Sequence, residues 1–76
     1  MLNNLNTLSS ERNKEVYKGL LAHMRRYNLP YTYVLNGLKD RNIYLTKEDL
    51  PSIAKDLEME VSPIRRYIKF NDIPMT

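Results

Sequence analysis

Few side chains that could form or break covalent bonds occur in this sequence, and those present lack partners at a useful spacing. The absence of cysteine excludes disulfides, thiolate zinc sites, iron–sulfur clusters and a cysteine nucleophile. His23 is the only histidine, and Ser9 and Ser10 lie outside any Gly-x-Ser-x-Gly motif. Two glycines are too few for a phosphate-cradling loop. We therefore expect no enzyme activity, and no catalytic, metal-binding or cofactor-binding residues.

The residues best suited to binding are cations in the last quarter of the sequence. Arg65, Arg66 and Lys69 follow the dipeptide Ser62-Pro63. An arginine can donate two hydrogen bonds to a guanine edge, whereas a lysine suits the phosphate backbone. Ser62 is expected to cap a helix with Pro63 in its first turn, where free N–H groups can meet a phosphate. These five residues are the predicted core of a DNA-binding site.

The segment before these cations has the pattern of two helices joined by a tight turn. Ala54 is the small residue that lets two helices approach closely. Apolar residues then follow at Leu57, Met59, Ile64 and Tyr67. Over about 20 residues, 49–68, the chain resembles the DNA-binding helix-turn-helix proteins of small prokaryotic, plasmid or viral regulators. The resemblance implies that the second helix reads DNA. Glu58 stands where that family usually has the turn glycine.

The apolar periodicity predicts an all-α fold, a small four-helix domain that contains a helix-turn-helix over residues 49–71. Apolar residues at spacings of three and four predict helices at 10–28, at 31–38 after Pro30, from 49 onward, and at 62–71. Residues 10–76 then form one helical domain, and the Asn-rich residues 1–9 a flexible N-terminal arm.

The start of the third helix has two solutions. Thr46 and Asp49 resemble a capping box, but Pro51 would then lie inside the helix. With Asp49 as N-cap, Pro51 falls in the first turn, where a missing N–H costs nothing, and this start is preferred.

Two further structural expectations concern short apolar segments and the tyrosines. Residues 43–45 can pair with residues 73–75 as a minimal, winged-helix-like β element. Four tyrosines are expected on apolar core stripes with their hydroxyls at the rim: Tyr17, Tyr27, Tyr31 and Tyr67.

The charge changes sign within the predicted helix pair. Residues 46–61 carry a net charge of −3 and residues 62–76 a net charge of +2, within an overall charge of +3. Residues 1–45 carry +4, and four of their cations are expected to lie along flanking phosphates: Lys14, Lys18, Arg25 and Arg26. No apolar run approaches the roughly 20 residues that cross a bilayer, and residues 1–8 do not resemble a signal peptide, so we expect a cytoplasmic protein without membrane contact.

These features favour sequence-directed binding of double-stranded DNA in transcriptional regulation, with helix 62–71 in the major groove. A homodimer is expected, because one small domain buries limited DNA surface; helix 10–28 and the leucines of the arm, Leu2, Leu5 and Leu8, are the expected contact. One alternative is a protein-binding module, a small phage or plasmid factor that binds a host protein. Another is an architectural, excisionase-like factor that bends DNA. The short, Asn-rich chain suits a mobile-element origin.

Overall fold

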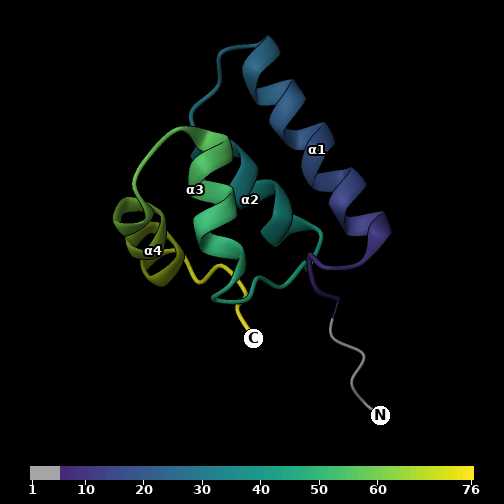
Figure 1. Cartoon of the computed structure of the whole chain (residues 1–76), viewed down its shortest axis with the longest axis vertical. Helices are drawn as coiled ribbons and strands as arrows, with labels where there is room; N and C mark the ends of the chain where they lie inside the picture. Colours follow the sequence, from purple (N-terminus) through teal and green to yellow (C-terminus); the bar gives the residue numbers. More distant parts are fainter. Residues whose placement is uncertain (1–5) are drawn as a thin grey trace.

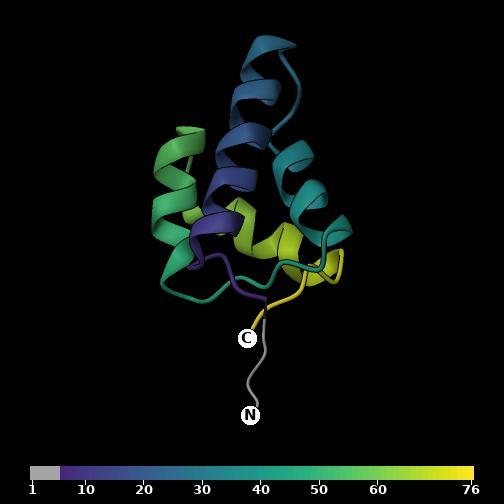
Figure 2. The ribbon, with the colours of Figure 1, turned by 90° about the vertical axis from the view of Figure 1, so that its right-hand side faces the viewer.

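Four helices make up most of the chain, as the periodicity predicts. The computed structural model describes residues 6–76, and its helices are α1 (Glu11–Arg26), α2 (Thr32–Asp40), α3 (Asp49–Leu57) and α4 (Val61–Phe70). α1 packs against α2 and α3 against α4. α4 lies on the side of the molecule away from α1, with α2 and α3 between them (Figure 1). It runs across the other three helices (Figure 2). The expected all-α fold is confirmed. No helix within residues 6–76 is both long and apolar enough to span a bilayer.

Ser10 caps α1, whereas the structure corrects the expected cap of α3. The Ser10 side chain accepts a hydrogen bond from the Asn13 N–H at 3.2 Å and caps α1. α3 begins at Asp49 itself, after Glu48, so Asp49 is the first helical residue and not the N-cap. Its carboxylate accepts the Thr46 N–H at 2.8 Å, which is one half of the capping box that the sequence suggested.

α4 begins one residue earlier than expected. Glu60, in an extended conformation, precedes the helix, and Ser62 is the second helical residue. The prediction that Ser62 is the N-cap is therefore wrong. Pro63 is then the third residue of α4, as Pro51 is of α3. The N–H at this position has no partner within a helix, so proline is tolerated there and does not fix the start to a single residue.

Each helix ends near a left-handed residue that is not glycine. These residues are Asn28, Asn42, Glu58 and Asp72, with φ between 52° and 57°. The following residue is apolar in every case, and its N–H bonds a carbonyl five residues back: Leu29 to Met24, Ile43 to Leu38, Met59 to Ala54 and Ile73 to Ile68, at 2.8–3.1 Å. This is the long hydrogen bond of a Schellman motif. It turns the chain back over its own helix, and the apolar residue is buried at Ile43 and Ile73 and partly buried at Leu29 and Met59.

A short β element closes the fold between the helices. Tyr44 forms a parallel bridge with Thr7, and Leu45 forms one with Met75. The Leu45 N–H donates to the Pro74 carbonyl at 3.1 Å, and the Leu45 carbonyl accepts the Thr76 N–H at 2.8 Å. We call residues 44–45 with their partners, 6–8 and 74–76, the central seam. The expected pairing of 43–45 with 73–75 is confirmed at the bridge between Leu45 and Met75.

The flexible arm predicted for residues 1–9 is not what residues 6–9 form; residues 1–5 lie outside the described part. The Leu8 side chain is buried, and its N–H donates to the Tyr44 carbonyl at 3.0 Å. The buried Asn13 amide donates to the Asn6 side chain and the Thr7 carbonyl, both at 2.6 Å. These bonds satisfy polar groups that would otherwise be costly to bury. Leu8 is therefore not available as part of a dimer contact.

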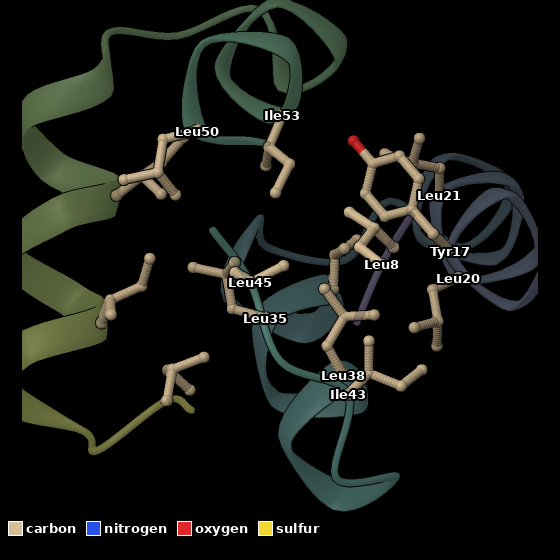
Figure 3. Close-up of a cluster of buried hydrophobic side chains, with 14 of the residues drawn as sticks. Leu8, Tyr17, Leu20, Leu21, Leu35, Leu38, Ile43, Leu45, Leu50 and Ile53 are labelled. Carbon is tan, nitrogen blue, oxygen red and sulfur yellow. The ribbon is translucent and has the colours of Figure 1, made fainter. Parts of the chain in front are cut away.

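The core lies where the helices meet the central seam. Figure 3 shows Leu8, Tyr17, Leu20 and Leu21 converging with residues of α2, α3 and the seam. Leu45 is completely buried at its centre. Gly37 on α2 is buried against Leu20 of α1, and a Cβ at this position would lie 2.7 Å from a Leu20 methyl carbon. The glycine thus permits the close approach of α1 and α2.

Replacing Glu58 by glycine is expected to stabilise the domain by about 1 kcal/mol. A left-handed conformation costs a non-glycine residue about 1–2 kcal/mol, and the greater freedom of glycine in the unfolded chain offsets part of this gain. Glu60→Gly is the matched control, because it removes the same charge from an extended residue with φ −73° and should destabilise. Thermal unfolding of both variants gives the comparison. Equal melting temperatures would contradict a conformational cost at Glu58.

Candidate nucleic-acid interface

The surface of α4 divides into a buried apolar stripe and an exposed polar face. Ile64 and Ile68 point into the core and are buried, as predicted. Ser62, Arg65, Arg66 and Lys69 are all exposed. Their spacing, i, i+3, i+4 and i+7, places them together on one face of the helix. The residues predicted from the sequence are therefore brought together by α4, with Pro63 partly buried beside them.

Within residues 6–76, no other element covers the exposed face of α4. α4 lies on the outside of the molecule, with α3 and α2 on its inner side (Figures 1 and 2). The side-chain hydrogen bonds within residues 6–76 involve neither Arg65 nor Arg66. The guanidinium donors of both residues are therefore available to acceptors on another molecule.

Contacts with α2 and α3 fix the position of α4. α3 packs against α4, and the small side chain of Ala54 on α3 is buried. The Tyr67 hydroxyl donates to the Asn36 side chain at 2.9 Å, and Lys39 donates to the Asn71 carbonyl at 2.8 Å. The first bond joins α2 to the second half of α4, and the second joins α2 to the residue that follows α4. The C-terminal part of the helix is thus held in place, which is what a preorganised binding surface needs.

A hydrogen-bonded cluster joins α1 to α3 and so supports the α3–α4 pair. The Tyr17 hydroxyl donates to the Asp56 carboxylate at 2.7 Å, and the Arg25 guanidinium donates to the Asp56 carbonyl at 2.6 Å. The Tyr17 ring reaches from α1 toward α3 (Figure 3). Burial, reinforced by the bond to Asp56, raises the pKa of Tyr17 far above its ordinary value. Tyr17 is therefore the neutral donor of this bond.

The cations of α1 are separated from those of α4. Lys14, Lys18 and Arg25 line a hollow that also contains the α3 carboxylates Asp49 and Asp56. This hollow lies between α1 and α3, whereas α4 is on the other side of the molecule (Figure 1). The expectation that these three residues lie along flanking phosphates stays a prediction; the structure places them beside α3, and helical spacing alone does not determine which element lies beside a helix face.

Arg26, the fourth cation predicted on α1, lies at the end of that helix. Its guanidinium carbon is 5.7 Å from the ring centroid of Tyr27, a cation–π distance. Tyr27 is 56% exposed, so the prediction that it packs in the core is wrong. The reason is that α1 ends at Arg26 and the turn carries Tyr27 away from the apolar stripe.

His23 is exposed and stacks on Tyr33, with 5.5 Å between the ring centroids.

The start of α4 is acidic. Glu58 and Glu60 are exposed and immediately precede the helix. Like charges repel, so these carboxylates oppose a phosphate at the first turn, where Ser62 was expected to help bind one. The cationic part of α4 begins one turn further on, at Arg65. The helix therefore offers its middle and its end to an anion, not its N-terminus.

Phe70 is a surface feature that the sequence analysis did not identify. It is the last residue of α4 and is 74% exposed, the most exposed of the large hydrophobic side chains in residues 6–76. Its position was deducible, because it follows Arg66 by one turn and lies off the stripe of Ile64 and Ile68. An aromatic side chain on a cationic face is thus part of the candidate interface.

Comparison of the chain with protein-family models, with curated proteins and with solved structures found no match. Within residues 6–76, no three His, Asp or Glu side chains cluster as metal ligands would. The candidate interface therefore depends on the geometry and charge of α4 alone.

The bond between Tyr17 and Asp56 makes stability sensitive to alkaline pH. Tyr17 in the unfolded chain loses its proton near pH 10, whereas in the folded chain its raised pKa retains it. This contribution is complete below about pH 10 and is lost as the pH rises above it. Tyr17→Phe should lower the free energy of unfolding at pH 7 by about 1–2 kcal/mol. It should also reduce the loss of stability above pH 10, measured by denaturant unfolding.

The exposed Tyr27 provides the control for this measurement. Tyr27→Phe leaves Asp56 paired and should change neither the stability at pH 7 nor its alkaline dependence. An unchanged alkaline slope in the Tyr17→Phe protein would show that the folded state does not retain that proton.

Proposed function

We propose that this protein binds double-stranded DNA in a sequence-directed manner and acts in transcriptional regulation, with α4 inserted in the major groove. The observation that carries the proposal is the outer face of α4. Arg65, Arg66 and Lys69 share that face, extend into solvent and lie opposite a buried apolar stripe. The proposal is also supported by the order and spacing of residues 49–68, which resemble the helix-turn-helix family, and by the packing of α3 against α4.

The roles of the three cations follow from their chemistry. Arg65 and Arg66 each present a planar fork of donors that matches the O6 and N7 acceptors of guanine. Lys69 is a point charge without such geometry, and it contacts the phosphate backbone. The acidic residues before α4 disfavour a phosphate at its first turn, so binding is centred on the second and third turns of the helix.

Replacing Arg66 by alanine tests the proposal. Arg66→Ala should weaken binding to a selected duplex by about 1–3 kcal/mol and relax the preference at one base pair. Lys14→Ala is the control: it removes one positive charge from the opposite side of the molecule and should act weakly and equally on all sequences. Selection of duplexes from a random pool, followed by gel-shift titration in rising salt, gives both comparisons. Equal affinity of the Arg66→Ala and unmodified chains would exclude α4 from the interface.

Salt dependence separates this function from the protein-binding alternative. Contacts with phosphates release counterions, so DNA affinity should fall steeply as salt rises. Binding to a protein partner that does not change with salt, together with no enrichment of any duplex, would favour a protein-binding module. A bending assay on the enriched duplex then distinguishes a regulator from an architectural factor.

Two copies are proposed to bind adjacent half-sites, because a single domain of this size covers little DNA. The enriched sequence should then contain two related half-sites about one helical turn apart. Sedimentation of the chain on that duplex should give a stoichiometry of two. A single copy on a duplex with one unrepeated site would contradict the dimer.

A further inference from the structure

The exposed ring of Phe70 is not explained by packing. It lies at the end of α4, one turn after Arg66 and two turns after Pro63, and it is 74% exposed. The aromatic side chain nearest to it in the sequence, Tyr67, instead bonds Asn36 and contacts the ring of Tyr31 edge-on at 6.0 Å. Leaving a phenylalanine in water sacrifices the stabilisation that its burial would provide.

Phe70 belongs to the same surface as the α4 cations. One hollow of about 450 Å³ is lined by Phe70 together with Arg65, Arg66 and Lys69. A second hollow, of about 220 Å³, is lined by Arg66 and Phe70 together with Tyr31 and Tyr67. Arg66 and Phe70 therefore form the ridge between the two hollows. An occupant of either hollow contacts a guanidinium and an aromatic ring together.

We propose that Phe70 is a specificity-determining residue that contacts the C5-methyl group of a thymine in the major groove. This inference rests on the proposed function. In the major groove, thymine is the base that presents a methyl group, and phenylalanine is one of the side chains that pack against it. Phosphate offers no comparable apolar contact. The ring thus gives the cationic face a means of recognising an A·T pair, which arginine and lysine do not supply.

The spacing along α4 predicts where this thymine lies. Arg66 and Phe70 are one turn apart, about 5.4 Å along the helix axis. Base pairs rise about 3.4 Å each, so two such side chains on a helix that follows the groove meet bases one or two steps apart. The enriched site is therefore expected to contain a guanine and, one or two steps away on either strand, a thymine.

Uracil substitution isolates the proposed contact, because uracil differs from thymine only by the missing C5-methyl group. Each thymine of the enriched duplex is replaced in turn, and the affinity of the full chain is measured. At the position one or two steps from the Arg66-dependent guanine, uracil should weaken binding about four-fold, the ratio that corresponds to roughly 0.8 kcal/mol for one buried carbon group. Phe70→Ala should bind the two duplexes equally, and Phe70→Leu should retain part of the discrimination.

Tyr27→Ala is the matched control, because Tyr27 is the other exposed large aromatic residue of residues 6–76 and lies at the end of α1. It should discriminate thymine from uracil as the unmodified chain does. Circular dichroism verifies that each variant is folded. If no uracil duplex binds more weakly while Arg66→Ala still loses specificity, the thymine contact is overturned and the proposed function stands. If the chain enriches no duplex, both are overturned.

Discussion

The complete burial of Leu45, with its backbone paired to the C-terminal segment, is the constraint on which the rest of the fold depends. A peptide group in an apolar core must find hydrogen-bond partners, and here residues 74–76 supply them. Tyr44 beside it pairs with residues 6–8 in the same way. Residues 44–45, in the link between α2 and α3, thereby hold both terminal segments. Residues 6–8 precede α1, and residues 74–76 follow α4.

Contacts with α3 and α2 hold the α4 surface in position. α1 holds α3 through the bonds of Tyr17 and Arg25 to Asp56, and α3 packs against α4. α2 adds the bond of Asn36 to Tyr67. None of these side chains belongs to the exposed face of α4. The residues that position the surface are thus distinct from the residues proposed to bind, so the two groups can be tested by separate substitutions.

Local patterns in the sequence predicted the four helices and the cations that α4 exposes. These features depend on residues three or four positions apart, which a single stretch of chain contains. The pairing of Thr7 with Tyr44 and the separation of Lys14 and Lys18 from α4 were not predictable in this way. They depend on which faces meet across some 35 residues or more of chain, and no local spacing encodes that choice. Phe70 differs from these features. Its place off the apolar stripe of α4 depends on the same local spacing and could have been predicted from the sequence.

The central seam also orders the events of folding. α1 with α2, and α3 with α4, are pairs of neighbouring helices, so each can form after closing only a short loop. The two bridges of the seam join residues 37 and 30 positions apart: one closes around α1 and α2, and the other closes around α3 and α4. Each pair is therefore expected to assemble with its own bridge, and the meeting of the two pairs at the adjacent residues 44 and 45 is the late event that makes unfolding cooperative.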